Sequence, residues 1–383
     1  MARPADSDER DELLLALPAR RRRAIQRPLL AWFAEAGRDL PWRRQRDAYR
    51  TWLAEIMAQQ TRLEAVVPYY QRFVERFPDL EQLAAAERDE VLALWSGLGY
   101  YSRGRNLHRT ARLLCAQHDG RLPADVESLA ALPGIGRYTA GAIASIALGR
   151  AEPAVDGNVK RVLARLFDIA ADLERPAVRE QLWQLAGRLV PADRPGDFNE
   201  ALMELGALVC TPRAPACAGC PLRRLCHARR RGTQLERPLP RRRRVPRLVT
   251  LRLALIRRPA GLLLVQNPSR GLFGGLWSLP LHPRTGRGNG DARALAKALE
   301  HDLGRATEVG PRLAAFDHLL THRRLQVRVH AVALQKGPLQ LHAYTAARWI
   351  SRPQQLEHLG LAALTRKALA AAGHPLGRSA MPP

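Results

Sequence analysis

The most constraining feature of this 383-residue chain is a change in the spacing of its apolar residues partway along its length. Between about residues 29 and 209 they recur every three or four positions, as in "TWLAEIMAQQT" (51–61) and "VREQLWQLAGRLV" (178–190), which is typical of amphipathic helices. Further on they alternate, as in "RLVTLRLALIRR" (247–258) and "RRLQVRVHAVAL" (323–334), which is typical of strands. We therefore predict an all-α domain followed by an α+β domain.

The domain boundaries follow from composition. The segment between the two patterns is rich in arginine and proline, which predicts a basic linker. The ends of the chain lack regular apolar spacing. The predicted parts are an N-terminal extension (1–28), a helical domain (29–226) ending in a cysteine loop (210–226), a linker (227–247), an α+β domain (248–373) and a tail (374–383).

The charge of the chain indicates a polyanionic partner. There are 61 Lys and Arg residues against 36 Asp and Glu, which gives a net charge of +25. Arginines neutralise phosphates and release their counterions, so we expect binding to nucleic acid. The apolar runs are shorter than the ~20 residues of a membrane span, and the acidic start "DSDERDE" argues against a secretion signal. We expect a cytoplasmic, nucleoid-associated protein that neither enters a membrane nor is secreted.

Four of the five cysteines are clustered. Cys210, Cys217, Cys220 and Cys226 have the pattern C-x6-C-x2-C-x5-C. Four thiolates this close suit a tetrahedral metal ion or an iron–sulfur cluster. Zinc sites usually contain two C-x2-C pairs and this segment has one, so the spacing and the soft ligands favour the iron–sulfur cluster over zinc.

The segment "ALPGIGRYTAGAIASI" (131–146) contains two glycines directly before a predicted helix. Gly134 and Gly136 permit close approach, and the helix start offers unpaired N–H groups, so the turn predicts a phosphate-binding site on DNA. Such a turn contacts the DNA backbone without reading its bases. The alternative is an ordinary helical hairpin.

Two carboxyl groups have positions that suit catalysis, one as a proton donor and the other as an ionised carboxylate. Glu55 lies beside the apolar face of its helix, where the charged form of its carboxyl group is disfavoured. It would therefore hold a proton and act as a general acid. The alternative is an ion pair with an arginine at the rim. Asp156 is predicted to cap the next helix, which keeps its carboxylate ionised and in place. A protonated and an ionised carboxyl group together are the arrangement that cleaves glycosidic bonds.

A series of segments in this order resembles one family. They are "LPWRR" (40–44), "TWLAEIMAQQT" (51–61), "WSGLGYYSRGRNL" (95–107), "ALPGIGRYTAGAI" (131–143), "AVDGNVKRVLARL" (154–166), "DFNEALMELGALVCT" (197–211) and the four cysteines. They resemble the adenine DNA glycosylases of the MutY type, within the helix-hairpin-helix superfamily that includes endonuclease III. The segment "GLFGGLWSLP" (271–280) is similar to the MutT-like, or Nudix-like, C-terminal domain of that family.

The resemblance implies a base excision repair enzyme that flips adenine out of double-stranded DNA and removes it where it is mispaired with 8-oxoguanine or G. It also implies one 4Fe–4S cluster, held by the four cysteines, and we expect a monomer. By position, Glu55 matches the acid that protonates the departing adenine, and Asp156, with Asn158 nearby, matches the carboxylate that stabilises the sugar cation. The residues matching the adenine pocket are Trp42, Arg43 and Glu200, and those matching the side that probes the opposite strand are Gln60, Thr61, Leu98 and Tyr100.

Tyr138 bears on the reaction type. Bifunctional relatives that resemble endonuclease III have a lysine at this position, which forms a Schiff base and leads to strand cleavage. Tyrosine has no amine nucleophile, so we predict a monofunctional, water-using glycosylase. Lys160, one turn after Asp156, has an amine that is able to trap an opened sugar, so weak lyase activity is also consistent with the sequence.

The C-terminal domain departs from the family pattern in two places. The family often has Phe-Ser-His where 8-oxoguanine is read, and this chain has Leu320, Thr321 and His322. Threonine keeps a hydroxyl group, so we expect Thr321 and His322 to read that base. The segment "GDARALAKALEHDLG" (290–304) has too few carboxylates for a Nudix magnesium site, so we expect a reader of DNA and not a hydrolase.

Two other classes of function remain open from the sequence. One is a bifunctional glycosylase and lyase for oxidised pyrimidines, against which Tyr138 and the C-terminal domain argue. The other is a non-catalytic DNA-binding protein with an iron–sulfur cluster. Base release distinguishes an enzyme from a binder.

Overall fold

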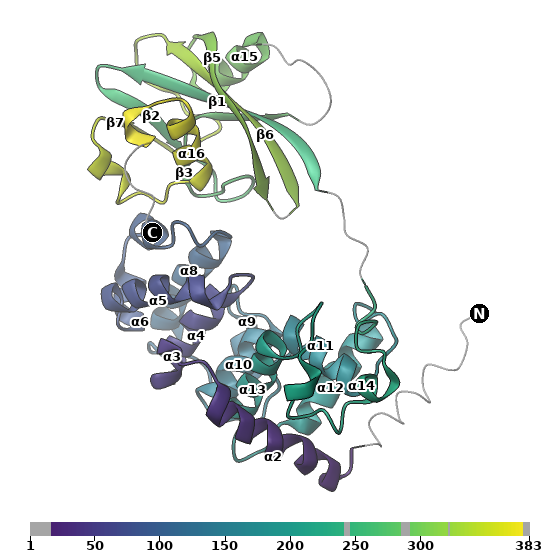
Figure 1. Cartoon of the computed structure of the whole chain (residues 1–383). Coiled ribbons are helices and arrows are strands. Elements are labelled where there is room, and N and C mark those ends of the chain that lie inside the picture. The colour runs from purple at the N-terminus through teal and green to yellow at the C-terminus, as the bar shows by residue number, and fades with distance from the viewer. Residues whose placement is uncertain (1–16, 241–245, 285–291, 321, 378–383) are drawn as a thin grey trace, which may run out of the picture. The chain divides into compact units, whose positions relative to one another are not determined.

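The structure is a computed structural model that describes residues 17–240, 246–284, 292–320 and 322–377 (Figure 1). The chain divides into two compact units, which are described separately below. The first contains residues up to 81 and 109–242, and the second contains residues 82–108 and 243 onward. No helix in the described part of the chain has the length and apolar content that crossing a membrane requires.

The first unit is helical, as predicted. Its elements are α2 (Ala19–Ala36), α3 (Pro41–Arg44), α4 (Ala48–Ala58), α5 (Leu63–Arg76), the start of α6 (Leu80–Ala85), the end of α8 (Ser102–Gln117), α9 (Val126–Ala131), α10 (Arg137–Ile146), α11 (Gly157–Leu166), α12 (Pro176–Leu189), α13 (Pro195–Leu208), the 3-10 turn η1 (Cys217–Gly219) and α14 (His227–Arg231). The predicted helical periodicity over residues 29–209 is therefore confirmed.

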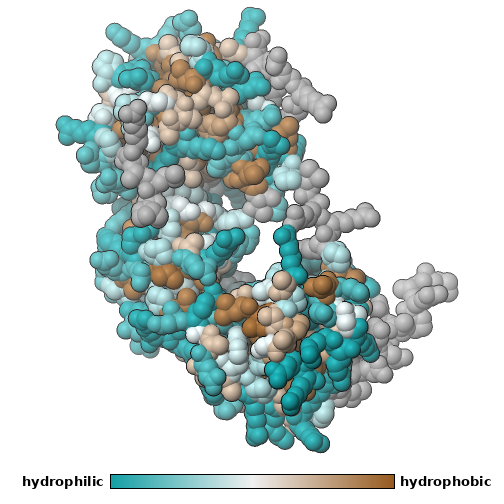
Figure 2. Space-filling view, in the orientation of Figure 1, coloured by the Kyte–Doolittle hydropathy of each residue, from teal (hydrophilic) through white to brown (hydrophobic). Residues whose placement is uncertain are grey.

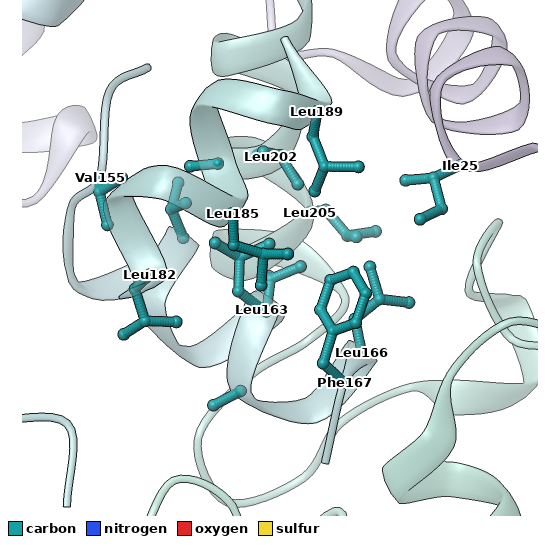
Figure 3. Packing of buried hydrophobic residues seen from close by; sticks show 14 of the residues in the cluster. Ile25, Val155, Leu163, Leu166, Phe167, Leu182, Leu185, Leu189, Leu202 and Leu205 are labelled. Atoms are coloured by element: carbon teal, nitrogen blue, oxygen red, sulfur yellow. The ribbon is translucent and has the colours of Figure 1, made fainter. Parts of the chain in front are cut away.

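One large core joins helices α2, α11, α12 and α13. Leu163, Leu182 and Leu202 belong to this core and are each 1% exposed or less (Figure 3). Burial of such side chains contributes roughly 1.5–3 kcal/mol each. This core fixes α11 against α13, which are the two helices that carry most of the acidic residues discussed below.

The helical unit extends beyond both of its predicted boundaries. Helix α2 begins ten residues before residue 29, and its Ile25 lies in the core at 1% exposure. Helix α14 lies within the predicted linker and buries Ala228. The arginines around Ile25 and Ala228 obscured the apolar spacing in both segments.

The second unit contains a seven-stranded mixed sheet. Its strands are β1 (Arg247–Arg258), β2 (Gly261–Gln266), β3 (Trp277–Ser278), β4 (Leu281–Arg284), β5 (Thr307–Leu320), β6 (Arg323–Leu334) and β7 (Ala346–Ile350). Strands β1 and β6 pair in parallel, and β5 returns antiparallel to β6. The remaining pairs are antiparallel: β1 with β2 and β4, and β2 with β3 and β7.

Two helices pack against opposite faces of this sheet. Because successive strand residues point to opposite faces, Leu253 and Leu255 of β1 join one core and Ala254 and Ile256 join the other. The first core contains apolar residues of α16 (Ala363–Ala371), and the second contains those of α15 (Ala292–Leu303). Strand β5 was not predicted, because most of its residues are exposed and its apolar residues do not alternate cleanly.

Hydrophilic residues cover much of the face shown in Figure 2.

The second unit also includes most of α6, all of α7 (Arg88–Leu94) and the first half of α8. The Asp89 carboxylate accepts a hydrogen bond from Trp277 Nε1 at 3.0 Å and one from Gln266 Nε2 at 3.2 Å. Leu92 packs with Leu276 and Ala362. The prediction of one contiguous helical domain over residues 29–226 did not anticipate this grouping, because pairings this far apart in sequence have no local signal.

We predict that Ile25→Ala lowers the free energy of unfolding by about 2–5 kcal/mol, because it leaves a cavity in the core of the helical unit. Arg23→Ala on the exposed side of the same helix is the control and should change stability little. Denaturant unfolding of both variants is the measurement. Equal stabilities would show that residues before 29 are a dispensable extension.

Candidate active site and cysteine cavity

The first unit contains a cavity of about 690 Å³. Its walls come from α3, α4, α10, α11, α13 and the turn after α4. Nine predicted site residues line it: Trp42, Arg43, Glu55, Gln60, Thr61, Tyr138, Asp156, Asn158 and Glu200. Segments more than 150 positions apart in the sequence therefore meet at one place.

Glu55 lies on the cavity wall near the end of α4. Burial raises its pKa to about 7, and the negative charges of Glu200 and Asp156 add to this effect. The Tyr138 hydroxyl donates a hydrogen bond to Glu55 Oε2 at 2.6 Å, which opposes the rise, as does Arg43. The partner of Glu55 is thus a tyrosine hydroxyl and not a rim arginine, and its carboxyl group holds a proton close to neutral pH.

Asp156 is both a helix cap and a cavity residue. Its Oδ1 accepts a hydrogen bond from the backbone N–H of Val159 at 2.7 Å, which caps α11 as predicted. Its Oδ2 accepts one from Asn158 Nδ2 at 2.8 Å. Burial raises the pKa of Asp156, while these two hydrogen bonds favour the ionised form and oppose the rise.

Hydrogen bonds connect Asn158 to the cysteine loop. Arg161 Nη2 donates to Asn158 Oδ1 at 2.9 Å and to the carbonyl oxygen of Gly206 at 2.8 Å, and Arg161 Nε donates to the carbonyl oxygen of Cys210 at 2.8 Å. Gly206 of α13 lies against Asn158 of α11. A Cβ atom there would lie 2.5 Å from the Cβ of Asn158, so only glycine allows α13 to approach α11 this closely.

A buried ionic network forms the opposite wall. Glu204 is 1% exposed and accepts hydrogen bonds from Arg38 Nε at 2.8 Å and Arg43 Nη2 at 3.1 Å, and these arginines lower its pKa to about 2. Glu200 accepts one from Arg43 Nε at 2.8 Å, although burial raises its pKa. The network therefore holds two carboxylates in place one helical turn apart.

Sequence reasoning missed Arg38, Arg46, Met203 and Glu204. Arg38, Met203 and Glu204 line the cavity, and Arg46 lies behind Glu200. The pair Glu200 and Glu204, spaced by four on an otherwise apolar helix, was a usable signal. Two buried carboxylates on one helix face require cations, and "GRDLPWRRQR" (37–46) supplies several.

The four predicted metal ligands meet in a second cavity. Cys210, Cys217, Cys220 and Cys226 line it, and they have free thiols. Arg165 Nη1 lies 3.3 Å from Cys210 Sγ, and Arg223 and Arg229 also line the cavity. Four soft sulfur donors facing one space, with cations beside them, fit the ligand set of an iron–sulfur cluster. Within the described ranges, no three His, Cys, Asp or Glu side chains are spaced to hold a single metal ion.

The remaining predicted residues lie outside the main cavity. Gly134, with a φ of 82°, and Gly136, the N-cap of α10, form the predicted turn before α10. Leu98 and Tyr100 lie in the turn between α7 and α8, where Leu98 is buried and Tyr100 is 40% exposed. His322 is exposed beside β6, and Thr321 lies outside the described residues.

Comparison with known proteins agrees with this geometry. Residues 53–188 match the HhH-GPD superfamily of base excision DNA repair proteins, and residues 252–371 match the NUDIX domain. The solved structure of a thermostable thymine-DNA glycosylase matches with a TM-score of 0.51 and 30% identity, covering 55% of this chain and 97% of that one. The fold and site thus define a helix-hairpin-helix base excision repair protein with a C-terminal Nudix-like domain.

Two curated relatives make the assignment narrower. The adenine DNA glycosylase of Rattus norvegicus is 37% identical over 86% of this chain and 74% of its own length. The adenine DNA glycosylase of Homo sapiens is 37% identical over 86% of this chain and 71% of its own length. The chain belongs to the adenine DNA glycosylase family.

We predict that Tyr138→Phe raises the pKa of Glu55 further above its value of about 7, because the variant loses the hydrogen bond that stabilises the ionised carboxylate. The carboxyl ¹³C chemical shift of Glu55, followed against pH, measures this. Tyr69→Phe, outside the cavity, is the control. An unchanged titration of Glu55 in Tyr138→Phe would contradict the assigned hydrogen bond.

Proposed function

We propose that this protein is a monofunctional adenine DNA glycosylase that removes adenine mispaired with 8-oxoguanine or G in double-stranded DNA and leaves an abasic site. The observation that carries this proposal is the pair of Glu55 and Asp156 in one cavity. Glu55 has a pKa of about 7 and Asp156 is held by two hydrogen bonds. A proton donor and an ionised carboxylate are the two groups that cleavage of a glycosidic bond requires.

In the proposed mechanism, the adenine leaves the duplex and enters the cavity. Glu55 donates its proton to the base, which makes the base a better leaving group. The C1′–N9 bond then breaks, and the electron pair goes to the base. Asp156 stabilises the positive charge that develops on the sugar, and water attacks C1′ and loses a proton. The Glu55–Tyr138 hydrogen bond orients the acid, and Asn158 orients Asp156.

Trp42, Arg43 and Glu200 form the proposed adenine pocket. Glu200 lines the cavity and is 4% exposed, and its Oε2, which lies 2.8 Å from Arg46 Nη2, has no partner in hydrogen-bond geometry. A buried acceptor without a donor favours a ligand that supplies one, since an unmade hydrogen bond is costly. The exocyclic amino group of adenine is such a donor.

The rest of the DNA contacts are assigned by resemblance to the family. Gly134 and Gly136 bind phosphate at the start of α10, where N–H groups point outward. Gln60, Thr61, Leu98 and Tyr100 probe the strand opposite the adenine, and Thr321 and His322 read 8-oxoguanine. The net charge of +25 supports binding to duplex DNA, and the α+β unit acts as a reader of the damaged base and not as a pyrophosphate hydrolase.

The four cysteines hold one 4Fe–4S cluster in this proposal. When bound, the cluster supplies a rigid link that positions the basic loop around it. Arg161 and Arg165 hydrogen-bond to the carbonyl oxygen of Cys210, so the loop is fixed to the helix that carries Asn158. We further propose that the protein works as a cytoplasmic, nucleoid-associated monomer.

Strand cleavage assays test the function. End-labelled duplexes with A opposite 8-oxoguanine should break only after alkali, because the enzyme leaves an intact abasic strand. Duplexes with A opposite T, or thymine glycol opposite A, should stay intact. Cleavage at thymine glycol without alkali would instead indicate a bifunctional enzyme, and borohydride trapping of Lys160, which also lines the cavity, would reveal lyase activity.

We predict that Glu55→Gln reduces the single-turnover rate by about 10²-fold or more while DNA binding persists, because glutamine has no proton to donate. In the unsubstituted protein the rate should fall above pH ~7, where Glu55 loses its proton. Glu75→Gln, an exposed carboxyl group outside the cavity, is the control. Full activity of Glu55→Gln would contradict the proposed acid.

We predict that protein purified without oxygen contains about four iron atoms and four sulfides per chain, and that Cys220→Ser lowers this content. Cys115→Ser is the matched control, because Cys115 lies outside the cysteine cavity. Iron and acid-labile sulfide analysis with visible absorbance is the measurement. Stoichiometric zinc without iron would contradict the cluster.

A further inference from the structure

Arg46 lies behind Glu200 on the side away from Glu204. It follows α3 and directly precedes Asp47, the N-cap of α4. Its Nη2 lies 2.8 Å from Glu200 Oε2, and its Nη1 donates a hydrogen bond to Asp197 Oδ1 at 2.5 Å. It therefore bridges two carboxylates of α13 that are three residues apart.

The Arg46–Glu200 contact is electrostatic in character. Although the two atoms are 2.8 Å apart, Glu200 Oε2 has no partner in hydrogen-bond geometry. Arg43 already donates to Glu200 Oε1, to Glu204 and to the carbonyl oxygen of Arg38. Arg46 thus balances the charge on Glu200 Oε2 through an ion pair.

Glu200 is surrounded by charges of both signs. Arg43 and Arg46 favour its ionised form, while burial and the charge of Asp197 disfavour it and raise its pKa. Glu204 is the next carboxylate on α13, and Glu55 of α4 interacts with Glu200 across the cavity. Since burial alone favours the protonated acid, the two arginines decide whether Glu200 only accepts hydrogen bonds or is also able to donate one.

We propose that Arg46 is a positioning residue that determines base specificity: it holds Glu200 as an acceptor, so that the cavity selects a purine with an amino group at C6 over one with an oxo group. This inference rests on the proposed function. It assigns a role to Arg46, which is not among the residues that line the cavity. An ionised carboxylate pairs with the amino group of adenine and repels the O6 atom of hypoxanthine. A protonated Glu200 would donate a hydrogen bond to O6 and remove that discrimination.

The test compares two substrates in four proteins. Duplexes with deoxyadenosine or deoxyinosine opposite G are incubated with the iron-loaded protein, and single-turnover rates are measured from pH 5.5 to 8.5. The variants are Arg46→Gln, Arg46→Lys and Arg194→Gln. Arg194 is the matched control, because it hydrogen-bonds to Asp197 but is more exposed and has no recorded ion pair with Glu200 among the described residues.

Arg46→Gln should lower the ratio of the adenine rate to the hypoxanthine rate by about tenfold or more, with a greater loss at lower pH, because removing the charge of Arg46 favours protonation of Glu200. Arg46→Lys should restore part of the ratio, and Arg194→Gln should leave it unchanged. Thermal melting shows whether each variant is folded. The rate ratio does not depend on the folded fraction.

Parallel losses on both substrates, or an unchanged ratio in Arg46→Gln, would overturn the inference. In either case adenine release by the unsubstituted protein would leave the proposed function intact. Failure of the unsubstituted protein to release adenine would overturn both.

Discussion

The close approach of helix α11 to helix α13 is the constraint on which the site depends. Gly206 permits it, and the leucine-rich core below secures it. Helix α11 brings Asp156 and Asn158 to the cavity, and α13 brings Glu200 and Glu204. A larger residue at 206 would separate these helices, and Asp156 and Asn158 would move away from the carboxyl groups of α13.

Electrostatics then give each carboxyl group a different state in one cavity. Glu204 has two arginine partners and remains ionised, whereas Glu55 has only a tyrosine hydroxyl and retains a proton near neutral pH. Burial raises the pKa of Asp156, and two hydrogen bonds oppose this rise. Differences in neighbours, and not in residue type, therefore separate the groups that stay charged from the group that is able to donate a proton.

The second unit is stabilised by a sheet and not by packed helices alone. Its sheet buries both faces, one against α15 and the other against α16, so the long apolar strands β1 and β2 are satisfied internally. Asp89 and Leu92 from the helical half of the sequence complete this unit through Trp277, Gln266 and Leu276. Domain boundaries drawn along the sequence therefore do not coincide with the compact units of the fold.

The sequence by itself determined the periodic elements and the residue types of the site. Helical spacing located α4, α11 and α13, the cysteine spacing located the four-cysteine loop, and the resemblance of short motifs to the family selected Glu55 and Asp156, because each of these signals is contained within a short segment. Only the tertiary structure decided that Glu55 faces Tyr138, that Arg43 bridges Glu200 and Glu204, and that Arg46 supports Glu200. The physical reason is that the pKa values and partners of these groups depend on burial and charge from segments more than 80 residues away, which no local pattern encodes.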